Sequence, residues 1–122
     1  MLKFAELDER VGIREQMELE TGPVVLVNTF TVKPEEAGLL LAAWAADAEV
    51  MKRQPGFVST QLHRGIGGSG VFLNYAVWES AGHFRRAFQN PEFQAHLGGY
   101  PSSTVATPHL FQKVAVPDIC EA

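Results

Sequence analysis

Two asparagines in otherwise apolar runs are the side chains whose chemistry the sequence leaves open. In residues 71–78, VFLNYAVW, the alternation of a strand places Asn74 on the same face as Trp78. Asn28 has a similar place in residues 24–32, VVLVNTFTV. An amide among apolar neighbours costs roughly 1–3 kcal/mol unless it finds hydrogen-bond partners. Either the fold supplies those partners, with Trp78 as core filler, or a ligand bound in a pocket does.

The four histidines show no spacing typical of a metal site. His63, His83, His96 and His109 form no HxH, HxxxH or HExxH pair, and no carboxylate cluster accompanies them. His63 and His109 lie on predicted strands and are candidates for a pocket, although a surface or hydrogen-bonded histidine is the commoner case. There is no GxSxG motif, and Cys120 lies in the C-terminal tail, so the sequence offers no nucleophile.

Two further patterns are interpreted as structural. GIGGSG, residues 65–70, matches the glycine spacing of a dinucleotide-binding loop, but it leads into a strand and not into a helix. We interpret it as the link of a β-hairpin. Glu35, Glu36 and Asp47 are predicted to be charges on the surface of a helix, not paired acid/base carboxylates. The apolar stripe of that helix is predicted to comprise Ala37, Leu40, Leu41, Trp44, Ala48 and Met51.

The elements that must position these residues follow the order β-α-β-β-α-β. Hydrophobic periodicity predicts strands at 24–32, 57–64, 71–78 and about 105–116. Helix-start signals predict helices beginning at Pro34, Ser80 and Asn90. This order predicts an α+β, ferredoxin-like fold, in which both main helices cover one face of a four-stranded antiparallel sheet. The other face is left bare. On residues 71–78 it would carry either the apolar row Val71, Leu73, Tyr75 and Val77 or the row with Asn74 and Trp78. A bare apolar sheet face predicts a two-fold homodimer.

Length and composition indicate one ordinary globular domain. The chain has 122 residues, a net charge of −4 and no basic run, so nucleic acid and anionic membrane surfaces are not expected partners. The single cysteine fits a reducing cytoplasm. Charged residues interrupt the first twenty positions, so we expect neither a signal peptide nor a membrane span there. We expect an N-terminal extension at 1–22 (a weak helix, an arm or a mobile tail), a domain at 23–117 and a tail at 118–122.

Four segments in order resemble the antibiotic biosynthesis monooxygenase domain family: VVLVNTFTVKPEEA, QPGFVSTQLHR, NYAVWES and FRRAFQNPEFQAH. The resemblance covers about Val24–Val116. It implies a ferredoxin-like domain that dimerises through its sheets into an α/β barrel. One group of the family oxidises phenolic or anthrone-like aromatics with O2 and no cofactor, and quinol monooxygenases are similar to it. In that group an asparagine four residues before a strand tryptophan lines the pocket, as Asn74 and Trp78 would. The tyrosine expected on the following helix falls near Phe84, so its phenol is missing.

A second group of the family degrades haem, and the sequence fits it less well. Asn28 matches its first-strand asparagine. Its helix tryptophan would fall at Ala87 and its iron-ligating histidine at Leu97, with His96 one residue away. One residue turns a helical side chain by about 100°. A third possibility is a dimeric barrel that binds a small ligand without catalysis, because a fold does not determine a function.

Our leading hypothesis is a homodimeric monooxygenase that oxidises a quinol, phenol or anthrone-like aromatic with O2, without metal or other cofactor. Asn28, Asn74 and Trp78 are the predicted catalytic residues. The predicted substrate pocket comprises Phe30, Trp44, His63, Phe72, Phe84 and His109. The alternatives are a non-catalytic binding module and, ranked lower, a haem-degrading monooxygenase.

Overall fold

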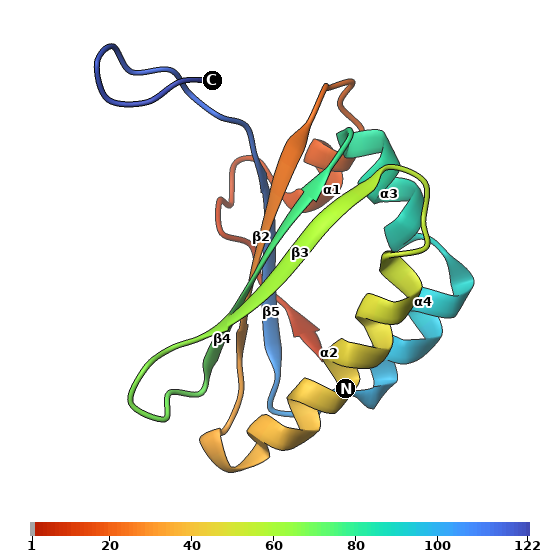
Figure 1. Ribbon diagram of the computed structural model, residues 1–122. Helices are drawn as coiled ribbons and strands as arrows, with labels where there is room; N and C mark the ends of the chain where they lie inside the picture. The colour runs from red at the N-terminus through yellow and green to blue at the C-terminus, as the bar shows by residue number, and fades with distance from the viewer. Residues whose placement is uncertain (1) are drawn as a thin grey trace.

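A five-stranded sheet carries all the main helices on one of its faces in the computed structural model, which describes residues 2–122 (Figure 1). The strand order is β1-β5-β2-β4-β3. The four long strands are antiparallel to their neighbours. Their bounds are Val24–Thr31 for β2, Phe57–Arg64 for β3, Val71–Trp78 for β4 and Val105–Phe111 for β5. The predicted βαββαβ, ferredoxin-like fold is confirmed.

The helices begin where the sequence signals place them. Their bounds are Pro34–Glu36 for the 3-10 turn η1, Ala37–Met51 for α2, Ala81–Phe88 for α3, Pro91–His96 for α4 and Leu97–Gly99 for the 3-10 turn η2. The Ser80 hydroxyl accepts a hydrogen bond from the amide of His83 at 3.1 Å and caps α3. The Asn90 side chain accepts from the amide of Glu92 at 2.8 Å, and Pro91 occupies the first position of α4.

The N-terminal segment adds a strand and a helix to this fold. Strand β1, Lys3–Phe4, pairs in parallel with β5, and helix α1, Ile13–Met17, lies between β5 and α3. The side chain of Gln16 bonds to both the backbone N–H and the C=O of Leu110, each at 2.9 Å, and so satisfies the edge of β5 that β1 does not reach. The domain boundaries at residues 22 and 117 stay a prediction.

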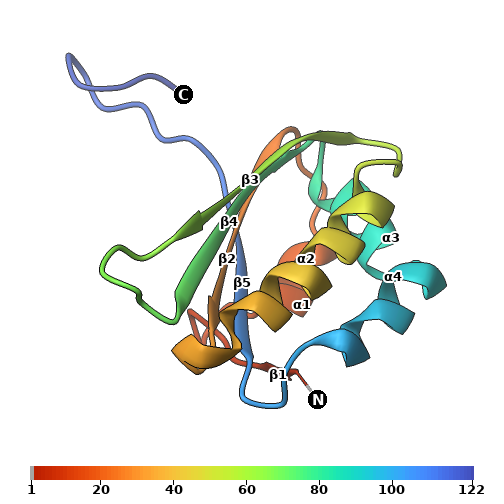
Figure 2. The ribbon, with the colours of Figure 1, turned by 60° about the horizontal axis from the view of Figure 1, so that its bottom comes forward.

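The two faces of β4 differ sharply in exposure. Phe72, Ala76 and Trp78 are 1–3% exposed and lie beneath the helices. Val71 and Tyr75 are more than 40% exposed on the opposite face, which no helix covers (Figure 2). The bare face therefore carries the apolar row of β4 that includes Val71 and Tyr75, and the face with Asn74 and Trp78 points into the domain. No helix in residues 2–122 combines the length and hydropathy needed to cross a membrane.

Candidate active site

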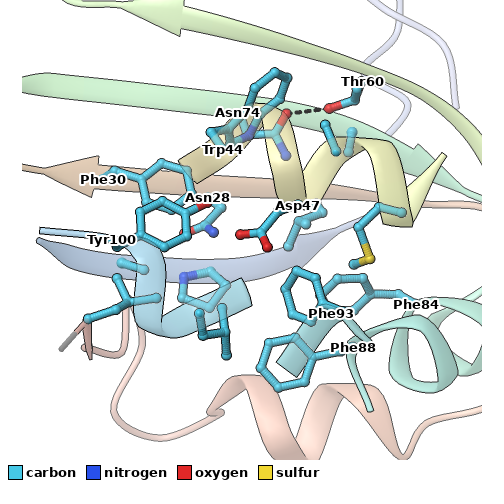
Figure 3. Close-up of a pocket in the computed structure, with 18 of the residues that line it drawn as sticks. Asn28, Phe30, Trp44, Asp47, Thr60, Asn74, Phe84, Phe88, Phe93 and Tyr100 are labelled. Carbon is cyan, nitrogen blue, oxygen red and sulfur yellow. Dashed lines mark hydrogen bonds between the residues drawn. The ribbon is translucent and has the colours of Figure 1, made fainter. Parts of the chain in front are cut away.

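A cavity lies between the inner face of the sheet and the helices α2, α3 and α4 (Figure 3). Its walls are mainly aromatic, and the empty space, including the part open to solvent, is about 680 Å³. The aromatic lining residues are Phe4, Phe30, Trp44, Phe57, Trp78, Phe84, Phe88, Phe93 and Tyr100. Such walls favour a planar apolar ligand, and the few polar groups among them must fix its orientation.

The orientation of the Asn74 amide is set by its neighbour on β3. The Thr60 hydroxyl donates a hydrogen bond of 2.5 Å to Oδ1 of Asn74. The amide oxygen is therefore occupied, and the Nδ2 group turns toward the cavity, as Figure 3 shows. Asn74 presents two N–H donors to whatever the cavity holds.

Asn28 lies directly opposite Asn74 in the register of β2 and β4. Directly opposed residues on one sheet face have Cβ atoms about 4.5–5.5 Å apart. Oδ1 of Asn28 is buried and has no hydrogen-bond partner among the residues that the structure describes. Two amides thus meet in one part of the cavity, and at least one polar atom there is left for a ligand.

Asp47 corrects a prediction, because this carboxylate is not on the helix surface. It is 5% exposed, it lines the cavity, and its Oδ1 has no partner within the described chain. Burial raises the pKa of Asp47 from 3.8 to about 6, although the Tyr100 hydroxyl and the charge of His96 oppose the shift. A carboxyl group with this pKa changes its protonation state near neutral pH.

The predicted apolar stripe of α2 is rotated relative to the observed one. Leu41 is 43% exposed, although the prediction places it inside. The buried residues of α2 are Ala37, Leu40, Ala43, Asp47 and Val50. This rotation carries Asp47 into the cavity beside the partly buried Trp44, three residues earlier.

Tyr100, just after η2, brings a phenol into the cavity. Its ring stacks on Phe30 with centroids 5.7 Å apart and an interplanar angle of 11°. Burial and the negative charge of Asp47 raise the pKa of Tyr100 far above its ordinary value, so its hydroxyl stays protonated. The resemblance places the missing tyrosine near Phe84, whereas here a phenol enters from a different element.

Trp78 is both packed and polar. It is 1% exposed and makes edge-on contacts with Phe57 and Phe84, at centroid distances of 5.4 and 5.8 Å. Its indole Nε1 is buried and finds no hydrogen-bond partner in residues 2–122. The side chain therefore fills the core and also lines the cavity.

Six of the nine predicted site residues line this one cavity: Asn28, Phe30, Trp44, Asn74, Trp78 and Phe84. The other three, which the sequence also predicts as pocket residues, do not line it. His63 lies on the open face, where its Nδ1 is 3.3 Å from the carbonyl oxygen of Leu73. His109 also lies away from the cavity, with Nε2 3.2 Å from Gln16 Nε2. Phe72 is buried on the inner face beyond the cavity, with the Arg64 guanidinium 5.2 Å from its ring centroid.

Five residues of the cavity are functional candidates that the sequence does not predict as site residues. Their signals are weak: a carboxylate in phase with an apolar stripe, a tyrosine after a glycine pair, a strand threonine and two apolar residues near the N-terminus. They are Asp47, Tyr100, Thr60, Leu2 and Phe4. Across the part of the chain that the structure describes, no three His, Cys, Asp or Glu side chains gather as metal ligands would.

Comparison with known proteins relates the chain to oxygenases. Residues 23–98 match the family model of antibiotic biosynthesis monooxygenases. Deoxynogalonate monooxygenase of Streptomyces nogalater is 36% identical over 93 residues, which are 76% of this chain and 78% of that protein. The crystal structure of SnoaB, a cofactor-independent oxygenase from Streptomyces nogalater, superposes with a TM-score of 0.70 at 30% identity, over 80% of this chain and 99% of SnoaB.

More distant structures share only the fold. A conserved protein of Methanosarcina mazei Go1 superposes with a TM-score of 0.61 at 12% identity, over 72% of this chain and 91% of that chain. The monooxygenase relatives, in contrast, support monooxygenase activity here. The chain belongs to the antibiotic biosynthesis monooxygenase family.

Proposed function

We propose that this protein is a cofactor-independent monooxygenase that oxidises an electron-rich aromatic, such as a quinol, a phenol or an anthrone, with O2. The single observation that carries the proposal is the pair of opposed amides, Asn28 and Asn74, in an aromatic-walled cavity. The similarity to SnoaB, described as a cofactor-independent oxygenase, supports the same chemistry.

The proposed reaction begins with an anion of the substrate. A phenolate or enolate is easily oxidised and passes one electron to O2. The two radicals then join to form a peroxide, which loses water and leaves a carbonyl, so that a CH2 group and O2 become C=O and H2O. The protein has to stabilise the anion, exclude water and move protons.

The residues of the cavity suit these tasks. The Asn74 Nδ2 donors, held in place by Thr60, would face the developing oxyanion, and Asn28 would assist from the opposite strand. Aromatic side chains such as Phe30 and Trp44 would bracket the planar substrate. These interactions act in a buried site, where a hydrogen bond to a charge is stronger than in water.

We also propose that the protein forms a homodimer through the open face of its sheet. The apolar residues of that face include Val25, Val27, Val71, Leu73, Tyr75, Val77 and Phe111. Tyr75 and Phe111 are 44% and 41% exposed in the single chain. An apolar face of this kind on so small a domain is typical of an association surface.

Oxygen consumption tests the proposed activity. The purified protein is treated with EDTA and assayed with a panel of naphthoquinols and anthrones, against a no-enzyme control for autoxidation. Oxygen uptake above the control, kept after metal removal, is the expected result. No uptake across the panel would contradict the proposal and favour a binding module.

A further inference from the structure

We propose that Asp47 is the proton acceptor of this site, a catalytic base that faces the substrate. This inference rests on the proposed function. The carboxylate lines the same cavity as the Asn28–Asn74 pair, is 5% exposed, and has an oxygen, Oδ1, with no partner among residues 2–122 (Figure 3).

A purely structural role does not account for Asp47. A buried carboxylate is costly unless a cation or several donors compensate it. No salt bridge to Asp47 occurs in the part of the chain that the structure describes. The groups on the neighbouring elements that act on it are the Tyr100 hydroxyl, after η2, and His96, at the end of α4. The polar cavity residues of the facing strands are Asn28, Thr60 and Asn74, which carry no charge.

Other candidates for the base are excluded by position or by protonation state. His63 and His109 lie away from the cavity. Tyr100 stays protonated, because burial and the Asp47 charge raise its pKa far above neutral pH, so it can donate a hydrogen bond but cannot take up a proton. The pKa of Asp47 lies at about 6, which leaves it mainly ionised at pH 7 and more basic than an ordinary carboxylate.

The proton balance closes with this one group. The carboxylate takes a proton from the substrate, which becomes the anion that reduces O2. After the C–O bond forms, the Asp47 acid protonates the peroxide anion. The carboxylate then takes the remaining proton from the carbon that bears the peroxide, the O–O bond breaks, and that proton leaves with the hydroxide as water. Asp47 is again a carboxylate, and O2 is the only oxidant required.

The variant that tests this role is Asp47→Asn, which keeps the shape of the side chain and removes the base. We expect kcat to fall by about 10²-fold or more for a quinol that is protonated at the assay pH. The loss should be smaller for a halogenated quinol that is already ionised at that pH and keeps a ring C–H, because this substrate bypasses the first proton transfer and needs Asp47 only for the later ones. The matched control is Glu49→Gln, an exposed carboxylate of the same helix, which should leave both rates unchanged.

Two further measurements separate catalysis from structure. The kcat/KM of the wild-type protein should rise with pH through about 6, and this rising limb of the pH profile should be absent in Asp47→Asn. Tyr100→Phe should retain most of kcat but move the limb to higher pH, because the hydroxyl lowers the pKa of Asp47. Equal losses for both quinols in folded Asp47→Asn, or an unchanged pH profile, would overturn the proposal.

A binding experiment keeps this test independent of the oxygenase activity. A nitronaphtholate that is ionised at pH 7 and does not react with O2 mimics the state after proton transfer. Its binding to the wild-type protein should take up close to one proton, measured by calorimetry in buffers of different ionisation enthalpy, and its binding to Asp47→Asn should take up none. Proton uptake without any oxygen consumption would contradict the proposed function and support the role of Asp47. Equal proton uptake by both proteins, or no binding, would overturn that role.

Discussion

Asn28 and Asn74 face each other directly across the antiparallel pair β2–β4, and both side chains point under the helices. Each strand alone shows only that its asparagine shares a face with apolar residues. The register between the strands makes the two amides one site, in which charge that develops on a substrate oxygen meets more than one donor.

Replacing Asn74 by alanine should lower turnover by about 10²-fold or more, because a donor aimed at the developing oxyanion is lost. The measurement is steady-state oxygen uptake with a quinol, together with circular dichroism to verify the fold. A folded Asn74→Ala variant with wild-type turnover would remove this amide from the mechanism.

Replacing Thr60 by valine should have a smaller effect of the same kind. The hydroxyl holds Oδ1 of Asn74, and without it the amide can rotate its donors away from the cavity. We expect kcat to fall about tenfold, equivalent to about 1.4 kcal/mol of the barrier. The control is Ser59→Ala, the neighbouring exposed residue of β3, which should not change kcat. A Thr60→Val rate equal to the control would show that Thr60 does not orient the amide.

Replacing Asp47 by asparagine should stabilise the protein at neutral pH even though it lowers activity. The folded state raises the pKa of Asp47 from 3.8 to about 6, so the wild-type protein loses stability as pH rises through this interval. At pH 7 this shift lowers the free energy of unfolding by about 3 kcal/mol. The neutral amide of Asp47→Asn does not carry this cost. Denaturant unfolding should show the advantage of Asp47→Asn at pH 7.5 and a much smaller difference near pH 4. A difference independent of pH would contradict this account of the carboxylate.

Replacing Val77 by aspartate should convert a dimer into monomers. Val77 lies opposite Val25 on the open face of the sheet, so a charge there would be buried without a partner in a dimer. Light scattering coupled to size exclusion should show the mass fall from that of two chains to that of one, 13.4 kDa. Leu39→Asp, at a 60% exposed position of α2, is the control and should remain dimeric. A monomeric wild-type protein would refute the proposed homodimer.

Strand alternation and helix-start signals were sufficient to predict the fold, but a local irregularity changed which β3 residues face the cavity. A β-bulge between Phe57 and Ser59 shifts the pairing of β3 with β4. Every later side chain of the strand is thereby moved to the opposite face. Thr60 enters the cavity as a result, and His63 points away from it. No local sequence signal announces this bulge.

Asp47 and the N-terminal segment show a second limit of sequence reasoning. A charge on a helix is usually exposed, so the sequence predicts the apolar stripe of α2 without Asp47. The orientation of α2 that buries Asp47 depends on packing against the sheet and α4. Leu2 and Phe4 reach the cavity because β1 pairs with β5, although residues before 23 lie outside the family match. Pairing between the two ends of a chain cannot be inferred from local periodicity.

The most direct test of the central claim is the fate of the oxygen atoms from 18O2. The EDTA-treated protein is incubated with an anthrone under 18O2, and the product is analysed by mass spectrometry at short times, with H218O as the control for exchange. We predict one 18O atom in the new carbonyl of each product molecule and one in water. Product without label, accompanied by an equal amount of hydrogen peroxide, would identify an oxidase and contradict the account.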